Sequence, residues 1–171
     1  PGCNSLERHR LLWIGIDCLQ KQGILNKGGR LLHIAPESCL EIQLRSHYDY
    51  VSVDMYVSGI EVKADITALC FPDQCFDVVI CNHVLEHVPE DRKALSELYR
   101  VLKHGGWGSI QGPIKGAQTL EDLSVADSAE RERLYGQSDH VRQYGEDFND
   151  RLRSAGFSVL ELRKEVLLEP V

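Results

Sequence analysis

Some segments of this chain carry hydrophobic residues at helical spacing, and others are short continuous apolar runs. The first pattern predicts helices and the second predicts strands, and the two alternate along the chain. Residues 6–25 carry Leu12, Ile16 and Leu19 at helical spacing, and glycines at and beyond Gly23 indicate where this first helix stops. Similar patterns predict helices over residues 39–46, 90–102 and 146–155. Short apolar runs predict strands over residues 30–35, 50–54, 61–64, 75–82, 107–111 and 157–162.

The order of these elements predicts an α/β fold. The run CFDVVICN at residues 75–82 is continuously apolar, as is typical of a strand covered on both faces. Strands that alternate with helices favour a mostly parallel sheet with right-handed crossovers and helices on both faces. Residues 113–143 are polar and lack a strand pattern, and their length indicates a lid or substrate loop. We expect one domain over residues 1–171.

Composition and charge narrow the range of partners. The net charge of −7 and the pI near 5.5 argue against broad contact with nucleic acid or with an anionic membrane, because both need clustered Lys and Arg. No apolar run reaches the roughly 20 residues that span a bilayer, and the first residues lack the pattern of a signal peptide. We therefore expect a cytoplasmic protein that acts on a small molecule.

Two sequence features bear on metal binding. The six cysteines form no C-x-x-C pair, which argues against a structural zinc site. Residues 83–87, HVLEH, match the H-x-x-E-H pattern of some zinc peptidases. That pattern needs a sustained helix and a distant third ligand, whereas this one follows a strand directly and meets Pro89 two residues later. The sequence therefore predicts no metal site.

Polar residues follow successive strands of the predicted sheet. Asp54 ends the second strand, Asp65 follows the third, and Asn82 and His83 end the central one. In an open parallel sheet, ligands bind beyond the carboxyl ends of the strands. A single Asp at such a place is often a helix cap or a turn former, but several polar residues in register indicate a shared crevice.

With these residues in place, the chain resembles the class I S-adenosylmethionine-dependent methyltransferases, especially the small "type 11" domains, over about residues 31–157. The resemblance rests on three blocks: VSVDMY, ADITALCFPDQCFDVVICNHVLEHVPEDRKALSELYRVLKHGGWGSIQGP and DHVRQYGEDFNDRLRSAGF. It implies a Rossmann-like, seven-stranded sheet. The chain ends at Val171, so only residues 165–168 are left for the last strand, and we expect an incomplete C-terminal hairpin.

The resemblance also implies which residues bind the cofactor. Asp54, with Met55 beside it, would hold the ribose of S-adenosylmethionine. Asp65 and the backbone near Ile66 would hold its adenine. Asn82 and His83 would lie beside the methionine part and the transferable methyl group.

The first loop departs from the family's usual pattern, an acid followed by three alternating glycines. Here His33 takes the place of the acid, and Ala35, Glu37 and Cys39 take the places of the glycines. Pro36 is expected to stiffen the loop and to steer Ala35 toward an extended conformation. Three interpretations stay open: Glu37 faces the cofactor's ammonium group, Glu37 is only a favourable charge at a helix N-terminus, or the loop no longer binds cofactor.

Methyl transfer from a sulfonium needs proximity and alignment, and it needs a base when the acceptor is a hydroxyl or an amine. His140 and His83 are the candidate bases, and Arg142 and Tyr144 are candidates for binding the acceptor. The main hypothesis is methyl transfer to an unidentified small molecule. The alternative is a degenerate domain that binds cofactor or partners without catalysis. A NAD-dependent oxidoreductase is disfavoured, because no G-x-G-x-x-G follows the first strand.

Overall fold

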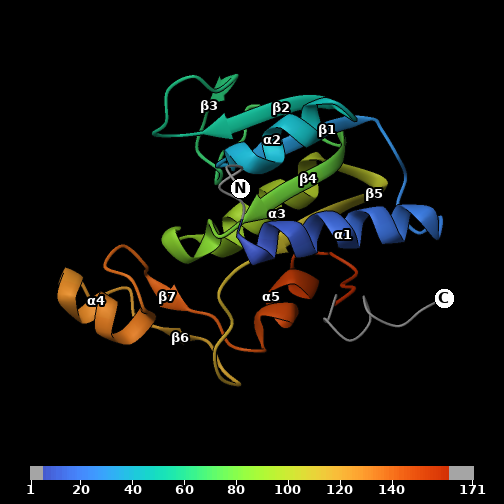
Figure 1. Cartoon of the computed structure of the whole chain (residues 1–171). Helices are drawn as coiled ribbons and strands as arrows, with labels where there is room; N and C mark the ends of the chain where they lie inside the picture. The colour runs from blue at the N-terminus through green and yellow to red at the C-terminus, as the bar shows by residue number, and fades with distance from the viewer. Residues whose placement is uncertain (1–5, 162–171) are drawn as a thin grey trace.

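The computed structural model describes residues 6–161 and alternates helices with strands (Figure 1). In chain order the elements are α1 (Glu7–Lys21), β1 (Arg30–Ile34), α2 (Ser38–Arg45), β2 (Asp49–Asp54), β3 (Val62–Lys63), β4 (Phe76–Asn82), the 3₁₀ turn η1 (Leu85–His87), α3 (Asp91–Val101), β5 (Leu102–Gln111), β6 (Leu120–Glu121), α4 (Ser128–Tyr135), β7 (Arg142–Gln143) and α5 (Phe148–Ser154).

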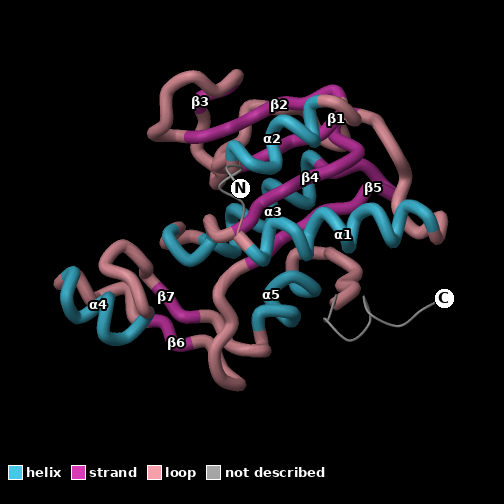
Figure 2. Tube along the Cα trace, viewed as in Figure 1, coloured by secondary structure: helices cyan, strands magenta, loops and turns pink. Residues whose placement is uncertain are grey.

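Five strands form one parallel sheet in the order β3-β2-β1-β4-β5. This order confirms the predicted Rossmann-like α/β fold. The remaining two strands, β6 and β7, pair antiparallel and stand with α4 away from the main sheet (Figure 2). No helix of the described chain is long and apolar enough to cross a membrane.

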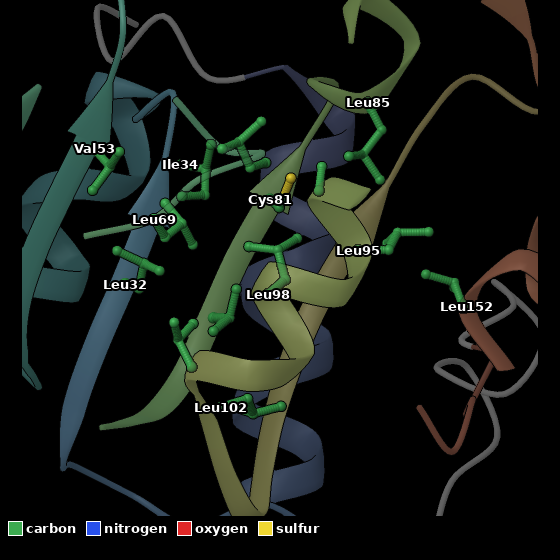
Figure 3. Packing of buried hydrophobic residues seen from close by; sticks show 14 of the residues in the cluster. Leu32, Ile34, Val53, Leu69, Cys81, Leu85, Leu95, Leu98, Leu102 and Leu152 are labelled. Carbon is green, nitrogen blue, oxygen red and sulfur yellow. The ribbon is translucent and has the colours of Figure 1, made fainter. Parts of the chain in front are cut away.

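Each face of the sheet has its own apolar core, because neighbouring residues of a strand point to opposite sides. Leu31 packs with α1 and α2 through residues such as Ile16 and Leu44. Leu32 packs on the other face with α3 and α5, where Leu98 and Leu152 lie. Figure 3 shows the second core, with Leu98 of α3 turned toward β4 and Leu95 on the side of Leu152. The helices therefore cover both faces, as expected.

The later part of the chain differs from the predicted elements. Residues 113–143 showed no strand pattern, but they contain β6, α4 and β7, and a role as a lid or substrate loop stays a prediction. Residues 157–161 form no strand, although one was predicted over residues 157–162. The expected last strand at residues 165–168 lies outside the described residues. Short elements with mixed polarity, such as the two-residue strands β6 and β7, leave no periodic signal in a sequence.

Candidate functional site

The carboxyl ends of β1, β2, β3 and β4 lie at one edge of the sheet. Ile34 is in register with Val53 and with Cys81, and Asp54 is in register with Lys63. Ligands of open parallel sheets bind at such an edge. The predicted cofactor residues follow these pairs directly, and they are Ala35, Asp54, Asp65 and Asn82.

Ala35 turns the chain sharply after β1. Its φ angle is 46°, in the left-handed region, so the expected extended conformation of this residue was wrong. Its N–H donates to the carbonyl of Val53 at 2.8 Å and continues the β1–β2 ladder, after which the chain has to reverse toward α2. This requirement overrides the preference that Pro36 imposes on its neighbour. Ala35 therefore adopts a left-handed φ of the kind that glycine tolerates best, at a cost of about 1–2 kcal/mol.

Glu37 precedes α2 at the N-cap position, but its side chain makes no capping hydrogen bond. Its carboxylate instead lies 3.4 Å from Nε2 of His33 and 3.1 Å from Nε2 of His9. Burial raises the pKa of Glu37, but the His33 hydrogen bond, the charges of His33 and His9, and Asn82 outweigh burial and lower it.

The two histidines have tautomers set by their other partners. Nδ1 of His9 accepts the N–H of Leu6 at 3.0 Å, which places the proton of a neutral ring on Nε2, beside Glu37. Nδ1 of His33 lies 2.9 Å from the hydroxyl of Tyr50, and Nε2 of His33 faces the carboxylate, which can only accept. Both rings therefore present an N–H group to Glu37, although the His9 contact is not an aligned hydrogen bond.

Asp54 ends β2 and shapes the loop that follows. Its Oδ1 accepts the N–H groups of Tyr56 at 2.6 Å and Val57 at 2.9 Å. The side chains of the loop are unusually exposed for apolar residues: Met55 at 43%, Tyr56 at 86% and Val57 at 58%. The end of β2 therefore carries an acidic side chain, Asp54, next to a group of exposed apolar side chains.

Asp65 follows β3 and forms a similar turn. Its Oδ1 accepts the N–H of Thr67 at 2.8 Å, while the neighbouring Ile66 is buried in the core. Asp54 and Asp65 therefore both act as turn formers, which is the structural role that the sequence also allowed for them. Each of these hydrogen bonds uses Oδ1 alone, so neither role excludes a ligand at Oδ2.

Asn82 and His83 end β4 at the centre of the sheet. Asn82 is buried, accepts from the hydroxyl of Ser109 at 3.0 Å and reaches Glu37. His83 has a left-handed φ of 55°, and its side chain remains 30% exposed. Its Nδ1 lies 3.3 Å from Oε1 of Glu86. Strained non-glycine residues such as Ala35 and His83 concentrate at functional sites.

Arg142, a candidate for binding the acceptor, is buried among protein partners. Its side chain is 0% exposed and donates to the carbonyls of Leu85, Val88 and Pro89. It also contacts Glu121, its partner across the β6–β7 pair. These contacts hold the small β6–β7 unit onto η1, so Arg142 is structural.

Tyr144 and His140 are also buried, which corrects two further expectations. The Tyr144 hydroxyl donates to Asp91 at 2.7 Å, and the same carboxylate oxygen accepts from Arg151 at 2.7 Å. His140 packs edge-on against His87, with 4.7 Å between the ring centroids. In this structure neither side chain is exposed to a substrate, and His83 is the accessible one of the two predicted bases.

A groove of about 1160 Å³ lies elsewhere, between α1, the free side of β5 and the region of α5. Of the predicted site residues, only His83 lines it, so this groove does not coincide with the other residues at the strand ends.

Sequence reasoning missed two partners of the predicted site residues: His9, which lies beside Glu37, and Asp91, which accepts from Tyr144. His9 lies 28 positions before Glu37, and Asp91 lies 53 positions before Tyr144. His9 and Asp91 each lie on the buried face of an amphipathic helix. A polar residue on that face is the one signal in the sequence that could have found them.

Comparison with known proteins agrees with this geometry. Residues 34–110 match a family described as "Methyltransferase domain". The ubiquinone/menaquinone biosynthesis C-methyltransferase UbiE of Bradyrhizobium sp. is 32% identical over 116 residues, which cover 57% of this chain and 44% of that protein. The arginine-hydroxylase NDUFAF5 of Rattus norvegicus is 31% identical over 112 residues, 64% of this chain and 32% of that protein. The chain thus spans less than half the length of these relatives.

Among solved structures, an S-adenosylmethionine-dependent methyltransferase from Mesorhizobium loti superposes with a TM-score of 0.59 at 14% identity, over 94% of this chain and 85% of that one. At that identity the likeness shows the fold. Together with the family match, it confirms the resemblance found in the sequence and supports S-adenosylmethionine as the cofactor of this domain. Residues 34–110 therefore match the methyltransferase domain family, and the fold is that of the class I S-adenosylmethionine-dependent methyltransferases, with a first loop that lacks the usual glycines.

Proposed function

We propose that the chain binds S-adenosylmethionine at the carboxyl ends of β1 to β4 and transfers its methyl group to a small-molecule acceptor. The observation that carries the proposal is the position of Asp54, Asp65 and Asn82. They end or follow the parallel strands β2, β3 and β4 of a β3-β2-β1-β4-β5 sheet, at the edge where open parallel sheets bind ligands.

The residues present fit a nucleoside with a cationic amino-acid tail. Asp54 offers a carboxylate oxygen that its turn does not use, which suits vicinal ribose hydroxyls. The exposed apolar side chains of Met55 and Tyr56 offer a surface on which an adenine ring can pack. Asp65 and the Ile66 backbone would hold the exocyclic amine, and the loop from Ala35 to Glu37 would border the methionine part.

S-adenosylmethionine supplies a methyl group that its sulfonium already activates, so the chain's residues chiefly align the partners and exclude water. His83 is the side chain placed to accept a proton from a hydroxyl or amine acceptor, because it is partly exposed at the end of β4. The negative net charge disfavours nucleic acid as the acceptor. The cytoplasmic location expected from the sequence stays a prediction.

One observation favours the alternative, a domain that binds partners without catalysis. The carboxylate of Glu37 already has His9 and His33 beside it, so the first loop is electrostatically complete without a ligand. Under this alternative no acceptor is methylated, whether or not the cofactor binds.

Calorimetric titration with S-adenosylmethionine and S-adenosylhomocysteine tests the binding. Asp54→Asn keeps an oxygen for the loop amides but removes the charge, and we expect both affinities to fall about 10- to 100-fold, the scale of a charge-assisted hydrogen bond. Asp49→Asn is the matched control, because Asp49 is an exposed acid at the other end of the same strand. Equal affinity in the parent protein and Asp54→Asn would refute the assignment.

Turnover separates the two functions. Formation of S-adenosylhomocysteine is measured with a panel of small hydroxyl and amine acceptors. If the domain is an enzyme, His83→Gln should lower kcat while cofactor affinity stays within about twofold, because the base acts on the acceptor's proton. Tight cofactor binding without turnover on the whole panel would favour the alternative.

A further inference from the structure

Three potential metal ligands meet beside the crevice. Glu86 and His87 lie on η1, directly after β4, and His140 lies just before β7. One ligand atom from each of the three lies within 4.8 Å of the others. Within residues 6–161 they form the one group of three acidic, histidine or cysteine side chains with this spacing.

Glu86 is the first sign that this group is more than chance. Its side chain is 1% exposed, and its Oε2 has no hydrogen-bond partner among the described residues. Its other oxygen, Oε1, lies 3.3 Å from Nδ1 of His83. A buried carboxylate oxygen without a donor is costly, and such atoms in native proteins call for an explanation, for example an ion.

The two histidines give the second sign. Nδ1 of His140 lies 3.1 Å from the carbonyl oxygen of Tyr135, and Nδ1 of His87 lies 3.2 Å from Oδ2 of Asp139. Both partners can only accept, so each ring carries a proton on Nδ1. In the neutral rings, Nε2 is then left with a lone pair. Metal-bound histidines usually have this arrangement, with the other ring N–H donated to a carboxylate or a backbone carbonyl.

Glu86 and His140 are buried and His87 is partly exposed, and one ligand atom of each lies within this small space. A cation bound between the three side chains would give a partner to the carboxylate and to an imidazole lone pair of each ring. Two imidazoles and one carboxylate suit a divalent first-row transition-metal ion such as Zn²⁺ or Mn²⁺. Three protein ligands leave coordination positions open, as in metal sites that bind a further ligand.

We propose that Glu86, His87 and His140 bind one divalent transition-metal ion. Ligand atoms lie about 2.0–2.2 Å from such an ion, so a spacing of up to 4.8 Å closes with small side-chain rotations. The sequence predicted no metal here, because the H-x-x-E-H match lacked a third ligand. The fold supplies that ligand as His140, which hydrogen-bonded backbone places beside η1: the Val141 N–H donates to the Glu86 carbonyl at 2.8 Å.

The test uses untagged protein that has been dialysed against a chelator and is then titrated with MnCl₂ and, separately, with ZnCl₂. We expect one equivalent of metal to bind and to raise the thermal unfolding temperature. His87→Ala, a partly exposed position that is safe for folding, should weaken binding at least 10-fold. Glu86→Gln, which keeps the shape, should do the same. His104→Ala, an exposed histidine outside the cluster, should bind like the parent protein.

Circular dichroism of each variant confirms that it is folded before the metal data are compared. Mn²⁺ matters because thiolates, which could hold Zn²⁺ elsewhere in this cysteine-containing chain, are poor ligands for it. Two outcomes would overturn the proposal. One is the absence of stoichiometric binding of either metal, which would mean that a proton fills the cluster. The other is binding that survives both His87→Ala and Glu86→Gln. Neither outcome depends on cofactor binding at Asp54.

Discussion

The loops after β1 and β4 contain the same types of residue, but histidine N–H groups point toward the carboxylate in the first loop and away from it in the second. Each follows a buried strand and contains a non-glycine residue in the left-handed region, Ala35 in one and His83 in the other. Each also carries a carboxylate close to two histidine rings. Around Glu37 both rings present N–H groups, whereas around Glu86 the rings of His87 and His140 direct their N–H groups away.

This difference separates a structural carboxylate from a candidate binding carboxylate. Glu37 has its donors within the protein, so it needs no ligand to be satisfied. Glu86 has one oxygen without a described donor, beside imidazole lone pairs. Similar residue types therefore indicate function only when the direction of their hydrogen bonds is known. The predictions that follow test this contrast.

The largest expected effect is on stability. Glu37→Ala removes the acceptor of the fully buried His33, and we expect it to lower the free energy of unfolding by about 1–3 kcal/mol, the cost of a buried group left unpaired. Glu86→Gln, measured with a chelator present, should change it by less than about 0.5 kcal/mol, because Oε2 has no donor to lose. Urea unfolding of both variants measures the difference.

If Glu86→Gln without metal destabilises the protein as much as Glu37→Ala does, Oε2 of Glu86 also has a donor and the contrast fails. Added Mn²⁺ gives a control, since it should stabilise the parent protein but not Glu86→Gln.

The next effect is a pH dependence that belongs to Glu37. The pKa of Glu37 in the folded protein is lowered from its ordinary value of 4.5. A lowered folded pKa adds stability that is fully present above the ordinary pKa and is lost as the pH falls through the folded pKa. We therefore expect the stability difference between the parent protein and Glu37→Gln to shrink as the pH falls below 4.5. A difference that grows on acidification would contradict the ion-pair assignment.

The smallest effect concerns the strained turn at Ala35. Ala35→Gly relieves a left-handed conformation but gives the unfolded chain more freedom, so we expect a net gain of up to about 1 kcal/mol. Ala35→Val should lose more than about 1 kcal/mol, because a β-branched residue is poorly tolerated at a positive φ. Thermal unfolding compares the two variants. Equal stability of the glycine and valine variants would show that the turn relaxes without strain.

Local patterns were enough to locate most elements of the sheet. The predicted strand over residues 75–82 became Phe76–Asn82, and the predicted helix over residues 90–102 became Asp91–Val101. These predictions worked because the periodicity of a buried strand or an amphipathic helix is contained within the element itself. The pairing of β6 with β7 joins residues about 20 positions apart, and no period within either strand could reveal it.

The sequence by itself determined the order of helices and strands, the acids and Asn82 at the strand ends, and the family resemblance that follows from them. Only the tertiary structure decided what each polar side chain does. It buried Arg142 and Tyr144 among partners near η1 and α3, placed His9 of α1 within 3.1 Å of the Glu37 carboxylate, and brought His140 to Glu86. The physical reason is that a polar group's role depends on its hydrogen-bond partners and its burial, and contacts between distant parts of the chain set both.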